Sequence, residues 1–254
     1  MTGTGAAGRL IGRLNAGIGF VRSLAIYHDP VALYRWRRFY ALLLDPGDLV
    51  FDVGAHVGTR SRAMRGAGAK VVALEPQAAF AAFLRRTLPR DVTVLEMAAG
   101  QTPGATSMAI SSRHPTVSTL SNEFVRDGRE ASGFEHVRWD RRQEVDVVTL
   151  DALIARFGLP RYAKIDVEGG EREVLSGLSS PVPLLSVEYL PALPHLALDL
   201  AEQLEDMGYS RFNVVAGEGG AFLWDGWRGK AELSAWLGDL PPDALSGDIY
   251  ARRT

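Results

Sequence analysis

Short apolar runs, each followed by a segment with helical spacing, are the feature that most constrains how this chain can fold. The runs occupy Leu49–Val53, Lys70–Glu75, Val92–Met97, Tyr162–Val167 and Leu184–Tyr189. The helices expected between and after them span Thr59–Arg65, Gln77–Leu88, Thr149–Phe157, Glu171–Leu175 and Leu196–Met207. A continuous apolar run of this length is typical of a strand that is buried on both faces of a parallel sheet. The pattern therefore predicts an α/β domain with helices on both faces of a mostly parallel sheet.

The first 45 residues form a helical segment ahead of this alternating pattern. Its first 38 residues carry six arginines and a single acidic residue, Asp29. Apolar residues from Leu10 to Leu24 recur at helical spacing, which predicts an amphipathic helix. Asp29 and Pro30 are typical of a helix start and predict a second helix over 31–44. The segment could pack on the main domain, close over a substrate site as a lid, or bind a membrane surface or a partner.

Residues 46–254 are expected to form one domain, which an insert at about 100–148 interrupts. The insert lacks a regular period and is dense in Ser, Thr, Arg and Gly. A loop of this length in a compact domain is usually functional or disordered, and we expect this one to recognise the substrate. Near the end of the chain, Tyr209–Val215 and Ala221–Trp224 are predicted to pair as a hairpin.

Composition excludes several classes of function. The chain has 254 residues, enough for a sizeable core, with 28 Lys and Arg against 30 Asp and Glu. The net charge of −2 gives no basic field for nucleic-acid phosphates, so no nucleic-acid partner is expected. The absence of cysteine excludes a disulfide scaffold, a thiolate nucleophile and a thiolate metal site. Arginines interrupt the apolar N-terminal stretch, so we expect no membrane span, no signal peptide and a cytoplasmic location.

The clearest chemical signal follows the first predicted strand. Asp52 stands at its carboxyl end, and Gly54 and Gly58 lie in the turn into the next helix. Ligands bind at this edge of an open α/β sheet. Gly54 allows the backbone to approach a ligand, and free N–H groups near Gly58 and Thr59 suit a carboxylate. Glu75 ends the second strand, where it can accept hydrogen bonds from two ribose hydroxyls, so the two acids indicate a nucleoside ligand.

The spacing of the two glycines narrows the choice of nucleoside. A dinucleotide site needs G-x-G-x-x-G and a phosphate-binding loop needs G-x-x-x-x-G-K-[ST], whereas this chain has G-x-x-x-G. S-adenosylmethionine has a ribose for Glu75, no phosphate, a carboxylate for the helix N-terminus and an ammonium for Asp52. It therefore fits the motif better than NAD or ATP does.

Four motifs in this order resemble those of the FkbM family of S-adenosylmethionine-dependent methyltransferases. They are Phe51–Thr59, Val72–Pro76, Val148–Asp151 and the stretch from Lys164 to Gly177. Glu188 and the closing residues Asp248–Arg253 are similar to the family as well. The resemblance implies a Rossmann-like class I methyltransferase fold, with a seven-stranded, mostly parallel sheet and an antiparallel last strand. It also implies methyl transfer to an oxygen of a sugar or secondary metabolite.

The positions matched by these motifs, with their neighbours, are expected to surround the cofactor. The expected contacts are Asp52, Gly54, Ala55, His56, Gly58, Thr59, Glu75, Pro76, Ala98 and Asp166. Many relatives carry Asn at the position of His56. This histidine is therefore expected to pack beside the cofactor turn rather than to titrate in catalysis.

Methyl transfer to an alcohol requires positioning of the acceptor and removal of its proton, by a general base or with a metal nearby. Asp166, Glu168 and Glu188 lie at neighbouring strand ends and are expected to converge at the mouth of the site. They could supply a base, bind Mg²⁺ through oxygen ligands, or hold loops by accepting backbone N–H bonds. Among the histidines His114, in the insert, is the best candidate base, with a solvated loop residue as the alternative. No histidine spacing suits zinc.

Together these features predict an S-adenosylmethionine-dependent O-methyltransferase that acts on a hydroxyl of a saccharide or other natural product. The expected partner is this hydroxylated small molecule, and a homodimer is a further possibility. Two other functions stay open: an NAD(P)-dependent oxidoreductase, which the glycine spacing disfavours, and a nucleoside-binding scaffold without turnover. Intact Asp52, Glu75 and Asp166 weigh against the scaffold.

Overall fold

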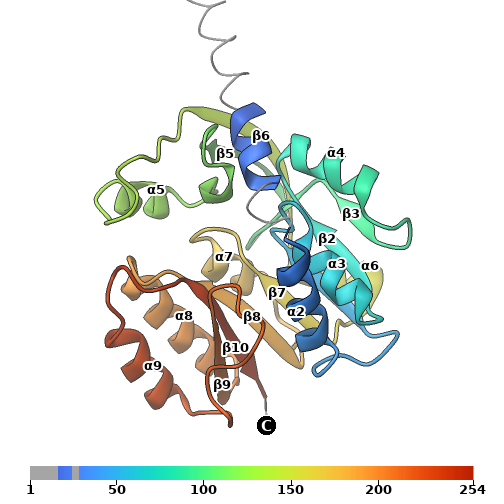
Figure 1. Ribbon diagram of the computed structural model, residues 1–254, viewed down its shortest axis with the longest axis vertical. Coiled ribbons are helices and arrows are strands. Elements are labelled where there is room, and N and C mark those ends of the chain that lie inside the picture. Colours follow the sequence, from blue (N-terminus) through green and yellow to red (C-terminus); the bar gives the residue numbers. More distant parts are fainter. Residues whose placement is uncertain (1–16, 25–28, 254) are drawn as a thin grey trace, which may run out of the picture.

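A seven-stranded sheet forms the centre of the computed structural model, which describes residues 17–24 and 29–253 (Figure 1). Its strand order is β3-β2-β1-β7-β8-β10-β9. The strands are Leu49–Val53 (β1), Lys70–Leu74 (β2), Thr93–Leu95 (β3), Tyr162–Ile165 (β7), Leu184–Tyr189 (β8), Arg211–Ala216 (β9) and Gly247–Arg252 (β10). Neighbouring strands are parallel except that β10 runs antiparallel to β8 and β9. The predicted α/β class and the antiparallel last strand are confirmed.

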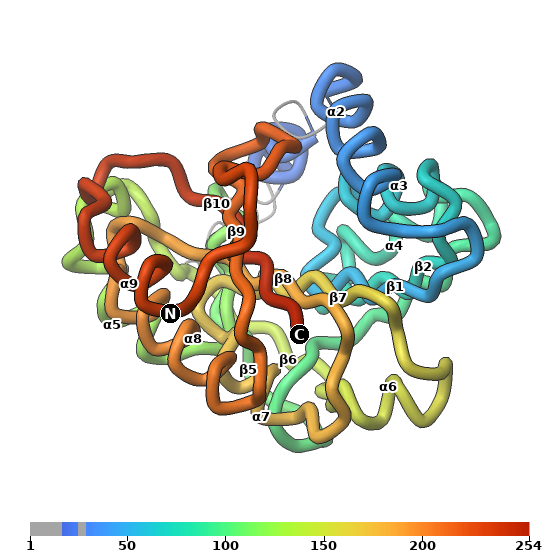
Figure 2. The backbone as a smooth tube through the Cα atoms, turned by 90° about the horizontal axis from the view of Figure 1, so that it is seen from below, coloured from blue at the N-terminus to red at the C-terminus, as the bar shows by residue number. Residues whose placement is uncertain are grey.

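Helices cover both faces of this sheet and enclose two hydrophobic cores. The first core receives side chains from Pro30–Tyr40 (α2), Thr59–Gly66 (α3) and Ala78–Thr87 (α4). The second receives them from Leu150–Phe157 (α6), Glu171–Ser176 (α7), Pro194–Asp206 (α8) and Lys230–Gly238 (α9). Figure 2 shows α2, α3 and α4 together on one side of the molecule, away from α8 and α9. Among the described residues, no helix is both long and apolar enough to cross a membrane.

Helix α2 is built into the first core. Asp29 caps it by accepting a hydrogen bond from a backbone N–H of the first turn at 2.8 Å, and Pro30 opens the helix. Trp36 and Tyr40 are fully buried against α3 and the sheet. The helix expected over 31–44 ends at Tyr40, and hydrogen-bonded turns complete the rest of that range.

A short helix at residues 17–24 precedes α2. The ring of Phe20 lies 5.0 Å from that of Phe80 and 5.6 Å from that of Phe83, both on α4, measured between ring centroids. Residues 17–24 therefore pack against α4. The part of the expected amphipathic helix that precedes residue 17 lies outside the described residues.

The insert folds into a second, three-stranded sheet, where the sequence indicated an irregular stretch. Its strands are Ala98–Ala99 (β4), Gly104–Ile110 (β5) and Arg141–Val148 (β6), in the order β4-β6-β5. Two further elements, a 3₁₀ turn at Pro115–Val117 (η1) and a helix at Asn122–Gly128 (α5), connect β5 to β6. The expectation of irregular structure was wrong. The core of this sheet contains few buried residues, among them Met108, Ile110 and Val145, so its apolar pattern is weak in the sequence. Strands β5 and β6 also carry exposed residues, and their sequence does not show the pattern of a buried strand.

The predicted hairpin between Tyr209–Val215 and Ala221–Trp224 is also wrong. Strand β9 pairs with β10 along its length, and residues 221–224 form no strand. The segment that follows β9 contacts it at isolated points, among them a bridge between Phe212 and Arg228. In that segment the backbone N–H of Leu223 does bond the carbonyl of Val214 at 2.7 Å, but the side chain of Asn213 takes the place of further ladder bonds. The apolar side chains that suggested a strand are used for packing instead.

Candidate active site

A cavity of about 670 Å³ opens at the carboxyl edge of the parallel strands. One part of its wall, the sheet half, follows β1, β2, β3 and β7 and includes Gly54, Glu75, Ala98 and Asp166. The other part, the insert half, is formed by lining residues between 100 and 123. Glu168, Glu173, Glu188, Glu218 and Ser246 complete the wall. The cavity thus lies between the main sheet and the insert.

The turn after β1 brings bare backbone against the end of β7. Gly54 has a φ of 81°, and a Cβ atom there would overlap the carbonyl oxygen of Asp166. The N–H groups of Gly54 and Ala55 donate to the carbonyl of Leu74 at 3.0 and 2.9 Å. Gly58, with a φ of 79°, ends the turn and starts α3. Glycine is required at position 54 both by the backbone angle and by this close approach.

Glu75 presents its carboxylate to the cavity in a fixed orientation. Its Oε2 accepts the backbone N–H of His56 and its Oε1 accepts that of Gln77, both at 2.8 Å. Burial raises the pKa of Glu75 to about 7, and the two N–H donors limit that rise. Both oxygens keep lone pairs that match two adjacent hydroxyls, as in a ribose. Glu75 and the Gly54 turn therefore fit a nucleoside without a phosphate.

Asp52 lies behind the cavity wall, in a row of buried polar groups. Strand register places it beside Lys164 of β7, which lies beside Ser186 of β8. Asp52 is fully buried, and it accepts a hydrogen bond from Ser61 Oγ at 2.5 Å. Burial raises the pKa of Asp52, and Lys164 opposes that rise. Its Oδ1 has no hydrogen-bond partner among the described residues.

Asp166, Glu168 and Glu188 meet at the cavity. One carboxylate oxygen of each lies within 4.8 Å of the others. Strands β7 and β8 are parallel neighbours in which Ile165 pairs with Val187, so the acids that follow lie side by side. Glu168 has a φ of 59°, which is uncommon for a residue with a side chain and is often found at functional sites. Local strand register and this strained turn bring the three carboxylates together.

The pKa values of the three carboxyl groups are shifted in different directions. Burial alone would raise the pKa of Asp166, but the ammonium of Lys164, 2.7 Å away, lowers it below its ordinary value. Burial, and then the negative charge of Asp166, raise the pKa values of Glu168 and Glu188 far above theirs. The side chain of Glu188 also lowers the pKa of Asp166. The group therefore combines an acid whose ionised form is favoured with two acids whose protonated forms are favoured relative to an ordinary glutamate. The oxygens of the three groups are also close enough to hold a divalent cation.

The other expected cofactor contacts divide into two groups. His56, Pro76 and Ala98 line the cavity, whereas Ala55, Gly58 and Thr59 lie outside its lining. The ring of His56 packs on that of Phe80, 4.5 Å away between centroids. Burial lowers the pKa of His56 to about 4, so the ring is neutral at pH 7.

The structure does not bring His114 to the three carboxylates. His114 precedes η1 and does not line the cavity. Its Nδ1 accepts a hydrogen bond from Arg22 at 3.2 Å, and its ring lies 4.6 Å from that of His136. Burial and the charge of Arg22 lower the pKa of His114. Its contacts join residues 17–24 to the insert.

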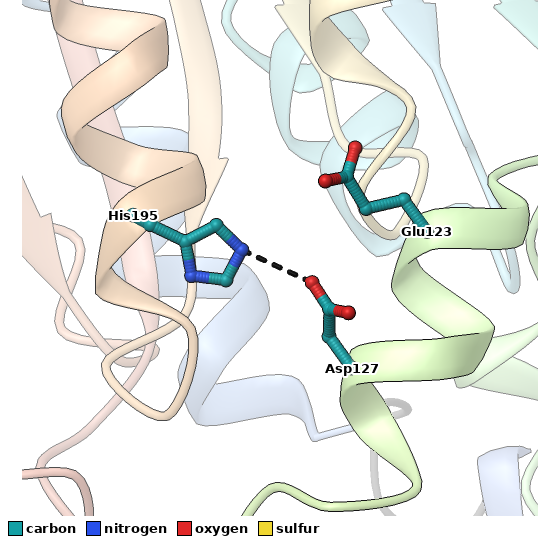
Figure 3. Close-up of side chains that lie close together, drawn as sticks. All are labelled: Glu123, Asp127 and His195. Carbon is teal, nitrogen blue, oxygen red and sulfur yellow. Dashed lines mark hydrogen bonds and ion pairs between the residues drawn. The ribbon is translucent and has the colours of Figure 1, made fainter.

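A second group of ionisable side chains, two acids and a histidine, lies between α5 and α8. Figure 3 shows Glu123 and Asp127 on one helix and His195 on the other, with His195 Nε2 bonded to Asp127 Oδ2 at 3.1 Å. Arg126 contacts Glu123 at 3.4 Å and Asp127 at 2.9 Å. The group therefore ties the insert to the main domain, and Glu123 also lines the cavity.

Several side chains at the site were not singled out from the sequence. Lys164 had a signal, because it is a charge inside a buried apolar strand. Glu218 had no such signal in the sequence. It lies in a turn after β9, and only the tertiary fold places it at the cavity wall. Trp36 Nε1 donates to Glu218 Oε2 at 2.6 Å, and Arg60 contacts Glu218 at 3.4 Å and Asp248 at 3.3 Å. This network joins α2 to the cavity wall.

Several solved structures resemble the chain over most of its length. Magnesium protoporphyrin IX methyltransferase from Synechocystis PCC 6803, solved with bound S-adenosylmethionine, is 12% identical with a TM-score of 0.48, covering 92% of this chain and 84% of that one. A TehB-like S-adenosylmethionine-dependent methyltransferase from Corynebacterium glutamicum is 10% identical with a TM-score of 0.48, covering 92% and 94%. Precorrin-6y C5,15-methyltransferase from Geobacter metallireducens is 15% identical with a TM-score of 0.43, covering 88% and 86%. A search of curated proteins finds no match.

The comparison with protein families identifies one family, whereas the similar structures come from several kinds of methyltransferase. The family model of the methyltransferase FkbM domain matches residues 52–210, more than half of the chain. The matched range contains the Gly54 turn, Glu75 and the three carboxylates, all of which line the cavity. The chain therefore belongs to the FkbM methyltransferase family and is an S-adenosylmethionine-dependent methyltransferase.

Proposed function

We propose that the protein transfers a methyl group to a hydroxyl oxygen of a saccharide or other small natural product. The observation that carries this proposal is the meeting of Asp166, Glu168 and Glu188 at the cavity. An alcohol must lose its proton as its oxygen attacks, so it needs an acceptor for that proton close by. Three buried carboxyl groups beside a nucleoside site suit this requirement.

The sheet half would hold S-adenosylmethionine. The backbone at Gly54 gives it a surface without side chains, Glu75 would accept the ribose hydroxyls, and Ala98 lines the wall beside them. When bound, this cofactor supplies a methyl group on a positively charged sulfur. The carboxylate of Asp166, kept ionised by Lys164, favours a positive charge in the cavity.

Glu168 is the general base in this proposal. Its carboxyl group lines the cavity and its backbone is held at a φ of 59°. The raised pKa of Glu168, caused by burial and by Asp166, makes it a strong proton acceptor once it is ionised. Glu188 would share the proton, because its Oε2 is buried without a partner among the described residues. Asp166 would position the pair.

The insert half supports a hydroxylated acceptor. Its lining includes the uncharged polar side chains of Thr102, Thr106, Thr116, Ser118, Ser121 and Asn122. Hydroxyl and amide groups both donate and accept hydrogen bonds, as the hydroxyls of a saccharide do. Met108 and Leu120 add apolar surface for the carbon skeleton.

The test uses pairs of acceptors that differ by one hydroxyl. The protein is incubated with ¹³C-methyl S-adenosylmethionine and either a glycoside or its deoxy analogue, with and without EDTA. We expect release of S-adenosylhomocysteine with the hydroxylated member alone, and a carbon NMR signal of a methyl bonded to oxygen. Methyl transfer to nitrogen or carbon, or equal turnover of the deoxy analogue, would contradict the proposal. Loss of turnover in EDTA would assign the three carboxylates to Mg²⁺ instead of to proton transfer.

A further inference from the structure

The charged side chains that line the cavity are all acidic. Among the described residues these carboxylates are Glu75, Glu123, Asp166, Glu168, Glu173, Glu188 and Glu218, and no Lys or Arg lines the wall. His56, the histidine of this lining, is kept neutral by burial, which lowers its pKa to about 4. An anionic acceptor would therefore meet repulsion and find no cation to bind.

Some of these carboxylates already have partners behind the wall. Asp166 is bound to Lys164 at 2.7 Å, and Glu218 accepts the indole N–H of Trp36 at 2.6 Å and lies 3.4 Å from Arg60. Glu75 accepts two backbone N–H groups. Burial and the charge of Asp166 raise the pKa values of Glu168 and Glu188 and so favour their uncharged forms. The cofactor brings one net positive charge.

Two carboxylates at the edge of the cavity are left over. Glu173, on α7, is exposed and has neither an ion pair nor a hydrogen bond from its side chain among the described residues. Glu123, on α5, is 55% exposed at its side chain, and its ion pair is with Arg126, itself 69% exposed, at 3.4 Å. Such an exposed pair contributes little and leaves the carboxylate available to a ligand.

Helix α5, which carries Glu123, contacts the turn that precedes α7, the helix of Glu173. A Cβ atom at Gly169, just before α7, would lie 2.5 Å from the ring of Phe124, the neighbour of Glu123 on α5. Figure 3 shows Glu123 projecting from α5 into the space between the helices. Glu123 and Glu173 both line the cavity, and α5 meets the turn before α7 there. We call this pair the rim carboxylates.

A second observation at the same cavity indicates a missing hydrogen-bond partner. The Oε2 atom of Glu188 is buried and has no hydrogen-bond partner among the described residues, although Glu188 lines the cavity. A buried polar atom of this kind costs free energy unless a ligand satisfies it. The acidic character thus continues from the rim to the three inner carboxylates.

We infer that the methyl acceptor is a hydroxylated molecule that carries a protonated amine and no phosphate or carboxylate group. The rim carboxylates bind the amine, while a hydroxyl of the same molecule reaches Glu168. This inference rests on the proposed O-methyl transfer and names its substrate class as an amine-bearing saccharide or similar polyol. It excludes sugar phosphates, uronic acids and nucleic acids as acceptors.

The test compares three disaccharides of one size and different charge. They are the disaccharide of glucosamine, its N-acetylated neutral form and the disaccharide of galacturonic acid. Each is titrated calorimetrically into the full chain saturated with S-adenosylhomocysteine. We expect the glucosamine disaccharide to bind at least tenfold more tightly than the neutral one, and the galacturonic acid disaccharide not to bind.

Variants assign the effect to the rim carboxylates. Glu173→Gln and Glu123→Gln should each weaken binding of the glucosamine disaccharide by about fivefold, as expected for the loss of one solvent-exposed charge pair. Neither substitution should change binding of the neutral disaccharide. The matched control is Glu130→Gln, since Glu130 is exposed at the end of α5 and does not line the cavity. It should bind all three sugars as the unmodified protein does.

The outcomes separate the inference from the proposed function. Binding of the galacturonic acid disaccharide, failure of the glucosamine disaccharide to bind, or equal effects of Glu173→Gln and Glu130→Gln would each overturn the inference. None of these would affect O-methyl transfer, which the paired alcohols test independently. Failure of S-adenosylhomocysteine itself to bind would contradict the proposed function.

Discussion

The two halves of the cavity are made in different ways. The sheet half consists of strand ends and tight turns, in which Gly54 and Glu75 are held by backbone hydrogen bonds to neighbouring strands. The insert half consists of side chains from a small three-stranded sheet, a 3₁₀ turn and a short helix. Tertiary packing fixes the first half throughout, whereas the second is attached through contacts such as that between His195 and Asp127.

This difference separates two tasks. A site made from the backbone of a buried sheet tolerates little change, so it suits a cofactor that stays the same. A site made from side chains of an insert can vary without disturbing the core, so it suits the acceptor. Glu168 and Glu188 lie where the halves meet, which is where methyl transfer must occur.

The largest effect is expected from Glu168→Gln, which removes the proposed proton acceptor at the place where the two halves of the cavity meet. Loss of a general base should lower kcat by about 10²- to 10⁴-fold, while the Kd of S-adenosylhomocysteine changes by less than about twofold. Turnover in the unmodified protein should rise with pH through the raised pKa of Glu168, because the base must be ionised, and this rise should disappear in the variant. Steady-state kinetics over pH and calorimetry give both quantities. Undiminished turnover would return Glu168 to a structural role.

The next largest effect is expected in the sheet half. Gly54→Ala would place a Cβ atom on the carbonyl oxygen of Asp166 at a positive φ, so the turn must move. We expect the affinity for S-adenosylhomocysteine to fall at least 100-fold by calorimetry. Gly170→Ala is the matched control, because the added atom would meet Val167 at an ordinary 3.4 Å. Equal affinities in the two variants would show that the Gly54 turn does not hold the cofactor.

A smaller effect is expected from the ionisation of Glu75. Its pKa, raised to about 7 by burial, means that the carboxyl group is protonated below pH 7 and ionised above it. Because the ionised form accepts hydrogen bonds from hydroxyls better, affinity for S-adenosylhomocysteine should fall by up to about tenfold for each pH unit below 7. Glu75→Gln should weaken binding by about tenfold and flatten this dependence. A pH dependence that survives in Glu75→Gln would point to another group.

The same division governs what could be predicted from the sequence. The Gly54 turn, Glu75 and the ends of β7 and β8 follow from local patterns, because a buried parallel strand and a glycine turn each have a recognisable sequence. The expected hairpin after Tyr209 was wrong because β10 comes from the end of the chain and inserts between β8 and β9. No local pattern encodes that pairing.

The insert half was the least predictable part. About half of the residues of β5 and β6 are exposed, so these strands lack the apolar period that marks a strand. Glu123 and Glu173 look like ordinary exposed acids on short helices, and only the tertiary fold brings both of them to the wall of one cavity. His114 was a reasonable candidate by residue type, but the structure puts it against Arg22 and His136 instead.

The most direct test of this account is the melting temperature of the protein with S-adenosylhomocysteine, and separately with NADPH. A ligand at about 100 times its Kd adds about 2.7 kcal/mol to the free energy of unfolding, which for a chain of this size raises the midpoint by about 5 to 10 °C. We predict that increase with S-adenosylhomocysteine, none with NADPH, and none with either ligand in Gly54→Ala. An increase with NADPH alone, or no increase with S-adenosylhomocysteine, would contradict the assignment of the sheet half to the cofactor.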